Sequence, residues 1–336
     1  MYKVVSLFSG CGGADLGIVG GFNFNAKWYK KLPYKLVYAT DIDQKALNTH
    51  TKNFKCENVK CEDICSTPSE SIPECDIIIG GFPCQSFSTV NPTKNPFDDR
   101  ANLYLQMVRI VRDKMPKVFI AENVKGLKTL HKGQIFQKII NAFENVGYKT
   151  YSMLINAADY GVPQKRERII IVGVRNDIDE KKMFSFPEPT HKNNWIPLSV
   201  AVPKLEIEDE KYYFSERAVQ GMKNAKNNMK RGLAQNLSEP CLTVTSHLAK
   251  VSLNSRDPVL LVDPVCEKYR RFTPREAARI QSFPDSFEFS GSETDAYRQI
   301  GNAIPPVMFW HIAHAVAELL KSETIIDGFR ENEYSS

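Results

Sequence analysis

The sequence predicts an α/β protein, with a Rossmann-like domain built on a mostly parallel, doubly wound sheet and a smaller irregular or β-rich domain. Two observations predict it. In the first half, short apolar or β-branched runs alternate with amphipathic stretches, which is typical of strands separated by helices. After Phe184 the alternation stops, and Pro187, Pro189, Pro197 and Pro203 interrupt the chain.

Each expected element follows from its local pattern. Apolar and β-branched runs predict six strands, in chain order 4–8, 36–40, 75–79, 117–121, 150–156 and 168–174. Helical periodicity predicts helices that open near Ala14 and cover 103–112, 134–145 and 309–321. Thr273 followed by Pro274 is typical of a helix start, since proline is tolerated in the first turn.

These elements divide the chain into three parts. Residues 1–185 are expected to form the first domain, completed by the C-terminal segment 301–336. Residues 186–268 form the smaller domain, because strand–helix alternation is absent there, and the orderly segment 269–300 is the hinge region between the two.

Length and composition narrow the class of protein. A chain of 336 residues can bury a sizeable core, and we expect no membrane span and a cytoplasmic location, since the sequence begins directly on a strand pattern. The net charge of +5 permits a polyanionic partner without requiring one. Four of eight cysteines cluster between 56 and 75, but without the paired spacing of zinc sites, so no metal is expected.

One local run is strongly basic. Its five cations have no Asp or Glu between them and are Arg217, Lys223, Lys226, Lys230 and Arg231. Such a cluster suits phosphate contacts, whereas the alternative is a solvated helix face.

The first candidate site is the turn Phe8-Ser9-Gly10-Cys11-Gly12-Gly13, between an expected strand and a helix. Glycines let the backbone turn sharply and let a ligand approach the main chain. Asp41 ends the next strand, where its carboxylate could accept hydrogen bonds from ribose hydroxyls, and Asp63 follows further on. The pattern favours a nucleoside-bearing cofactor. A dinucleotide enzyme and a turn without a ligand stay open.

The second candidate is Cys84, in the segment 80–88 that leaves an apolar strand. A cysteine thiolate is a strong nucleophile once its pKa is lowered by nearby cations or amide groups. The alternative is a buried, inert thiol.

Three further clusters lie at strand ends or in loops. Glu122 and Asn123 end the strand 117–121, where a carboxylate is either a solvated cap or a working acid. The charged segment 164–168 could equally be a surface cluster, and 299–306 could be an ordinary loop.

Together and in this order, these segments resemble the DNA cytosine-5 methyltransferases of bacterial restriction–modification systems and their eukaryotic relatives. The matching blocks are FSGCGG, GGFPCQSFS, ENV, QKRER, RRFTPREAARIQSFP and YRQIGNAIPP, from Phe8 to Pro306. Only 186–268 departs, which is where that family varies.

The resemblance implies methyl transfer from S-adenosylmethionine to carbon 5 of cytosine, with S-adenosylhomocysteine as the product. Cys84 would add to carbon 6 and Glu122 would bond ring nitrogen 3, while Arg168 and Arg166 hold the base oxygen and backbone. Asn123 would brace the loop that carries Cys84. Because the base is unreachable inside a duplex, it would be flipped out of the stack.

The resemblance also implies a cofactor pocket. Its expected residues are Phe8, Ser9, Gly10, Gly12, Gly13, Asp41, Ile42, Asp63, Ile64, Pro83, Leu103, Asn302 and Ala303. Many members of the family have glutamate and an adenine-stacking aromatic where this chain has Asp41 and Ile42, so we expect weaker cofactor affinity. The segment 23–35 is an apparent insertion to which no function is assigned.

Residues 186–268 would be the target-recognition domain for double-stranded DNA. The expected DNA-binding residues are Gln85, Ser86, Ser88, Arg100, Lys223, Lys230, Arg231 and Thr243. A cognate restriction endonuclease is a possible partner, and a monomer is expected because one flipped base needs one catalytic centre. The rival interpretations are a cytosine-5 methyltransferase acting on transfer RNA and a DNA-binding protein without catalysis.

Overall fold

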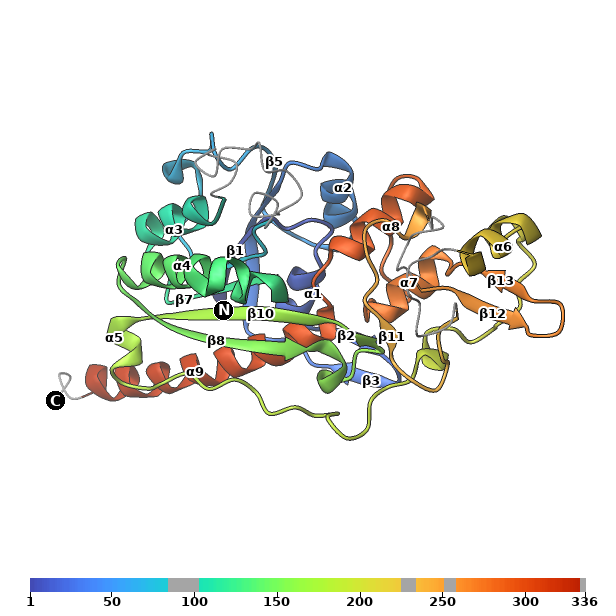
Figure 1. The fold of residues 1–336 in the computed structure, drawn as a ribbon. Helices are drawn as coiled ribbons and strands as arrows, with labels where there is room; N and C mark the ends of the chain where they lie inside the picture. Colours follow the sequence, from blue (N-terminus) through green and yellow to red (C-terminus); the bar gives the residue numbers. More distant parts are fainter. Residues whose placement is uncertain (84–102, 225–233, 251–257, 333–336) are drawn as a thin grey trace.

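The structure is a computed structural model that describes residues 1–83, 103–224, 234–250 and 258–332 (Figure 1). Its central sheet has seven strands in the order β5-β4-β1-β6-β7-β10-β8. Their bounds, in that order, are Asn58–Cys61, Tyr34–Asp41, Tyr2–Leu7, Ile77–Gly80, Val118–Val124, Glu167–Arg175 and Tyr148–Asn156. The first five strands are parallel to one another, whereas β10 is antiparallel to β7 and β8. The predicted mostly parallel, doubly wound sheet is confirmed.

Helices cover both faces of this sheet. The side chain of Val4 packs with α1 (Gly13–Val19) and α9 (Pro306–Asn332), whereas that of Val5 packs with α3 (Leu103–Lys114) and α4 (Gln134–Glu144). In β7, Ile120 lies on the same face as Val4, and Phe119 lies on the same face as Val5. Figure 1 shows α3 and α4 on one side of the sheet and α9 along the other. Strands buried on both faces read as continuous apolar runs, which is why the sequence revealed them.

The first part of the helix α9 belongs to a long apolar stretch. By length and composition alone, the stretch 293–321, which contains α8 (Glu293–Asn302) and the first part of α9, is long and apolar enough to cross a membrane. Most of it is buried inside the protein, and Phe309, Ile312 and Val316 lie in the core beneath the sheet. Its apolarity is therefore that of a core helix.

The apparent insertion forms a β-hairpin that the sequence did not predict. Its strands are β2 (Phe22–Phe24) and β3 (Lys27–Tyr29), joined by Asn25 and Ala26, which both have positive φ. Tyr29 stacks on Phe22 and meets the edge of the Trp310 ring, so the hairpin packs against α9. Aromatic contact across the hairpin supplies the stability that two short strands lack.

The region from 186 to 268 is irregular in its described residues, as expected. It contains α6 (Glu216–Asn224), β11 (Cys241–Leu242), β12 (Leu260–Asp263) and β13 (Lys268–Arg270), together with short 3-10 turns. β12 and β13 pair antiparallel, whereas β11 pairs in parallel with β9 (Gln164–Lys165) from the first half of the chain. This small two-strand sheet connects the irregular region to the segment just before the start of β10.

Four remaining helices complete the described fold: α2 (Gln44–Asn53), α5 (Asn176–Asp179), α7 (Pro274–Ile280) and α8. α7 begins as predicted at Thr273, whose hydroxyl accepts a hydrogen bond from the Glu276 backbone while the Glu276 carboxylate accepts one from the Thr273 amide. This capping box satisfies amides that a helix start otherwise leaves unpaired.

Candidate active site

The turn after β1 lies at the carboxyl edge of the parallel strands. Gly10 and Gly12 have φ values of 54° and 93°, a left-handed conformation that glycine adopts without strain. Phe8 also has a positive φ of 54°. A Cβ at position 10 would meet no atom within 4 Å, so there is open space beside this backbone. A ligand can therefore approach the main chain closely at Gly10.

Asp41 connects this turn to the end of β4. Its Oδ2 accepts a hydrogen bond from the Gly10 amide at 2.8 Å, and its Oδ1 accepts one from the Asp43 amide at 2.9 Å. Desolvation raises the pKa of the Asp41 carboxyl, and these backbone hydrogen bonds oppose that shift. Each oxygen keeps a further lone pair, so the carboxylate can hold the turn and accept a hydroxyl at the same time.

The two residue pairs expected near an adenine differ in exposure. Ile42 is 75% exposed, so its apolar surface is available to a ligand. Asp63 is exposed and accepts a hydrogen bond from the Cys65 amide, whereas Ile64 is only 4% exposed and packs in the core. The Ile64 side chain thus offers little contact area. Arg109 of α3 holds this segment by donating to the Ile64 and Thr67 carbonyls.

The junction of α8 and α9 lies directly against the glycine turn. A Cβ at position 13 would lie 3.1 Å from the Ala303 Cβ and 2.4 Å from the Ile304 carbonyl oxygen, which explains why only glycine fits. Asn302 is exposed and Ala303 is buried. Pro83 is exposed at the end of the described β6 loop, and Leu103 is half-buried at the start of α3.

Glu122 and Arg168 form an ion pair across the ends of β7 and β10. The Nε of Arg168 lies 2.8 Å from Oε1 of Glu122, and their side chains are only 13% and 12% exposed. A Cβ at position 81 would lie 3.3 Å from Oε2 of Glu122. The carboxyl group therefore lies beside the segment that leads to Cys84.

Asn123 holds that same segment. Its Nδ2 donates to the Phe82 carbonyl at 2.8 Å, and its Oδ1 accepts a hydrogen bond from the Val124 amide. The side chain is 3% exposed, so both bonds are protected from water. This geometry fits the bracing function expected for Asn123.

Arg166 does not share the position of Arg168. Its guanidinium donates to the carbonyl oxygens of Val244 at 3.0 Å, Gly301 at 3.0 Å and Ala303 at 3.1 Å, and its side chain is 3% exposed. Burial lowers the pKa of this guanidinium, and the nearby Arg168 lowers it further. In this structure the group is occupied by backbone carbonyls from two distant segments, and the expected contact of Arg166 with the target base stays a prediction.

Two buried glutamines, which no sequence motif marked individually, complete the contact between these segments. Gln164 Nε2 donates to Gln281 Oε1 at 2.8 Å, while Gln164 Oε1 accepts from the Val244 amide. Gln281 Nε2 donates to the Ile300 carbonyl at 2.6 Å. Buried and exposed side chains alternate along 164–168, as in a strand. Gln164 and Arg166 are buried, whereas Lys165 and Glu167 form exposed ion pairs with Glu239 and Lys125. This alternation was the signal that could have marked Gln164 as a buried contact.

Gly301 permits the close approach of the same two segments. A Cβ at this position would lie 2.2 Å from the carbonyl carbon of Thr245, closer than any real contact. The backbone of 245–246 therefore packs on the glycine of the IGNAIPP segment.

The expected DNA-binding residues are only partly described. The Thr243 hydroxyl donates to the Lys165 carbonyl at 2.8 Å, beside the β9–β11 pair. Lys223 of α6 forms an ion pair with Glu267, so its charge is already compensated. The other expected residues lie outside the described residues, as does the nucleophile, and they are Cys84, Gln85, Ser86, Ser88, Arg100, Lys230 and Arg231.

The described residues show neither disulfides nor clusters of metal-ligating side chains. None of the seven cysteines that the structure describes is joined in a disulfide. Within the described ranges, no group of three or more His, Cys, Asp or Glu side chains could hold a metal ion.

Solved structures of methyltransferases align with nearly the whole chain, so its fold is a methyltransferase fold. A putative DNA modification methyltransferase from a prophage of E. coli aligns with a TM-score of 0.71 at 24% identity, covering 96% of this chain and 100% of that one. The Dnmt2 methyltransferase of S. pombe also aligns with a TM-score of 0.71, at 19% identity, over 96% of this chain and 99% of its own. At these identities the likeness establishes the fold.

Sequence comparison establishes the family. Residues 2–318 match the family described as C-5 cytosine-specific DNA methylase. The Type II methyltransferase M.NgoFVII of Neisseria gonorrhoeae is 37% identical over 98% of this chain and 88% of its own length. The Type II methyltransferase M.NlaX of Neisseria lactamica is 35% identical over 96% and 97%. The chain belongs to the C-5 cytosine-specific DNA methylase family and is a DNA (cytosine-5) methyltransferase.

Proposed function

We propose that this enzyme modifies a flipped-out cytosine within a short specific sequence of double-stranded DNA, through a covalent adduct with Cys84, as the modification enzyme of a restriction–modification system. The observation that carries the proposal is the Glu122–Arg168 pair beside the segment that Asn123 holds. An acid and a cation at the exit of that segment match the charge that develops when a thiolate attacks a pyrimidine.

S-adenosylmethionine is the proposed cofactor, and it supplies an electrophilic methyl group when bound. The open space beside Gly10 and the exposed side chain of Ile42 fit a nucleoside-bearing molecule. Asp41 would accept hydrogen bonds from ribose hydroxyls, and Asp63 would contact the adenine. Asn302 and Ala303 would line the far side of the pocket.

The protein groups would act in sequence on the base. The Cys84 thiolate adds to carbon 6, and Glu122 donates a hydrogen bond or proton to ring nitrogen 3 as negative charge builds up there. Arg168 would orient the Glu122 carboxyl and contact the base oxygen. Carbon 5 then takes the methyl group and gives its proton to water, which expels the Cys84 thiolate from carbon 6, and ring nitrogen 3 returns its proton to Glu122.

The arrangement of domains is also a proposal. Residues 1–185 with 301–336 would form the catalytic domain, 186–268 the target-recognition domain and 269–300 the hinge. The β9–β11 pairing and the Arg166 contacts to Val244 support a defined orientation of the recognition domain. We further propose a cytoplasmic monomer, with a cognate restriction endonuclease in the same system.

The test is transfer of labelled methyl groups from S-adenosylmethionine to duplex DNA and, in parallel, to transfer RNA. Wild-type protein should methylate duplex DNA, and Cys84→Ala should abolish turnover. If the labelled methyl group appeared in transfer RNA and not in DNA, the enzyme would instead be assigned to the RNA-modifying alternative. Activity that survives in Cys84→Ala would remove the proposed nucleophile.

A further inference from the structure

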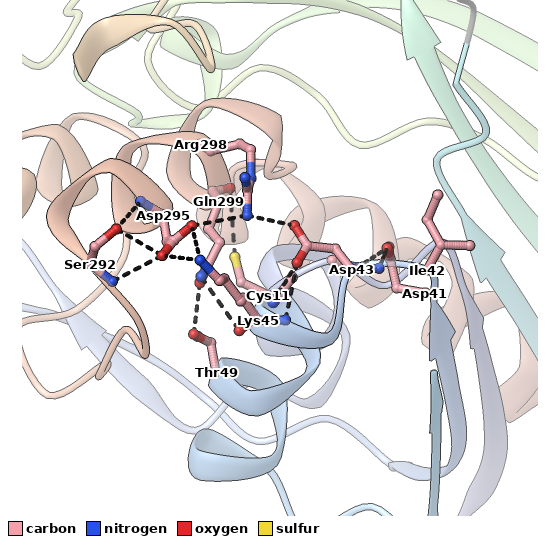
Figure 2. A network of polar contacts seen from close by, with 12 residues as sticks. Cys11, Asp41, Ile42, Asp43, Lys45, Thr49, Ser292, Asp295, Arg298 and Gln299 are labelled. Atoms are coloured by element: carbon pink, nitrogen blue, oxygen red, sulfur yellow. Dashed lines mark hydrogen bonds and ion pairs between the residues drawn. The ribbon is translucent and has the colours of Figure 1, made fainter. Parts of the chain in front are cut away.

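The helices α2 and α8 meet along a polar seam that no part of the mechanism above uses (Figure 2). The seam consists of side chains on one face of α2 and its cap together with the segment 288–299. Its residues are Asp43, Lys45, Thr49, Asn53, Glu288, Ser290, Asp295, Arg298 and Gln299.

Charged groups close the end of the seam nearest to the pocket. The Lys45 ammonium lies 3.1 and 2.8 Å from the two oxygens of Asp295. The Arg298 guanidinium lies 3.1 Å from Asp43 Oδ2 and 3.1 Å from Asp295 Oδ1. Asp295 also accepts from Ser292 at the start of α8, and the hydrogen bond from Lys45 is the main reason that the pKa of this carboxyl is lowered. The four side chains form one network (Figure 2).

A buried amide continues the seam. Gln299 Oε1 accepts from the Thr49 hydroxyl at 2.7 Å, and Gln299 Nε2 donates to the Ser290 carbonyl at 3.0 Å. The Cys11 thiol donates to the Gln299 carbonyl at 3.7 Å. One residue of α8 thus contacts both the glycine turn and α2.

The two helices carry opposite walls of the proposed cofactor pocket. α2 is capped by Asp43, directly after Asp41 and Ile42, and the Asp43 carboxylate accepts from the Lys45 and Ala46 amides. α8 ends at Asn302, directly before Ala303. The spacing between these two walls therefore depends on how α2 is held against α8.

We propose that Lys45 and Arg298 are positioning residues that set the distance between the Asp41–Ile42 wall and the Asn302–Ala303 wall of the cofactor pocket. This inference rests on the proposed cofactor function. Neither side chain is required to touch the cofactor, because both act through Asp43 and Asp295.

Because Lys45 and Arg298 are partly exposed to solvent, their effect on cofactor binding can be measured separately from any effect on stability. The side chains of Lys45 and Arg298 are 58% and 42% exposed. Their shared partner Asp295 is only 5% exposed, but it keeps the hydrogen bonds from the Ser292 amide and hydroxyl when a cation is removed, so each alanine variant should leave the fold intact. A change in cofactor affinity without a change in stability would then report the geometry of the pocket.

The experiment measures S-adenosylhomocysteine binding by calorimetry for Lys45→Ala, Arg298→Ala and the double variant. The matched control is Lys52→Ala, because Lys52 pairs with Glu288 at the far end of the same helix, where the side chains are 51% and 63% exposed. We expect Kd to rise about fivefold in each single variant and more in the double variant, as for a coupling of modest size. Lys45→Arg should restore near wild-type affinity.

Kinetics and thermal unfolding complete the test. KM for S-adenosylmethionine should rise while kcat, KM for DNA and Tm stay near wild-type values. An unchanged Kd in both alanine variants would overturn the inference, as would an equal rise in Lys52→Ala or a rise that follows a fall in Tm. Wild-type protein that binds no S-adenosylhomocysteine would instead contradict the proposed cofactor, which keeps the two failures apart.

Discussion

The Nε of Arg168 lies 2.8 Å from Oε1 of Glu122, although the two residues are 46 positions apart in sequence. Antiparallel pairing of β10 with β7 brings them together, since Ile170 lies opposite Glu122 in that register. The pair is largely buried, so the attraction is less screened by water than at an exposed surface. It holds the carboxyl group in a fixed orientation beside the segment that precedes Cys84.

Replacement of Glu122 by glutamine should remove the proton donor and keep the shape of the site. We expect kcat to fall by about 10²- to 10⁴-fold, the range of a general acid. Steady-state methyl transfer measures this, with S-adenosylhomocysteine binding as the control for folding. A wild-type kcat would exclude proton donation by Glu122.

The two arginines should respond differently to substitution. Arg166→Met leaves three buried carbonyls without their donor, so we expect a loss of about 3 kcal/mol or more in the free energy of unfolding. Arg168→Met should lower kcat with a much smaller effect on stability.

Denaturant unfolding and methyl transfer, measured on both variants, separate these effects. The distinction would fail if Arg166→Met unfolded like wild type and lost only turnover, because Arg166 would then act at the base after all.

Position 42 should control cofactor affinity. The exposed Ile42 side chain offers aliphatic contact where an aromatic ring could stack on adenine. Ile42→Trp should lower the Kd for S-adenosylhomocysteine about three- to tenfold, since an aromatic stack contributes roughly 0.5–1.5 kcal/mol. Ile42→Ala should raise it. Equal affinity in all three proteins would show that this side chain does not line the pocket.

Stability should fall as the pH is lowered because of His311. This buried ring of α9 lies among Tyr29, Tyr160 and Trp310, and burial lowers its pKa from 6.5 to about 3. The unfolded chain therefore binds a proton below pH 6.5 that the folded chain excludes until about pH 3. Stability is fully present above pH 6.5 and is lost progressively below it, by at most about 1.4 kcal/mol per pH unit.

His311→Phe keeps the ring and removes the titration. Denaturant unfolding of both proteins between pH 7 and 4.5 should give a shallower loss for the variant. His191 and His314 also have lowered pKa values, so part of the slope should persist. Identical slopes would show that His311 does not contribute.

Much of the fold was predictable because its strands are buried on both faces and read as apolar runs. The observed β7 and β10 cover the predicted 117–121 and 168–174 almost completely. The hairpin at 22–29 was not predictable, since its stability comes from contact of Tyr29 with Trp310, nearly the whole chain away.

Glu122 and the glycine turn could be predicted as site residues, because each is recognisable from residue type and from its place directly after an expected strand. The separation of Arg166 from Arg168 was not, because it depends on carbonyl groups of Val244 and Gly301 that only the folded chain brings near. The α2–α8 seam could not be predicted from the sequence for the same reason, since Lys45 and Asp295 are 250 positions apart.

The central claim is methylation of carbon 5 of cytosine at a short DNA site. The most direct measurement is bisulfite sequencing of DNA from a methylation-free bacterial host that expresses this protein. We predict 5-methylcytosine confined to one short motif, and its absence when Cys84→Ala is expressed. DNA that stays unmethylated while soluble wild-type protein accumulates would contradict the account.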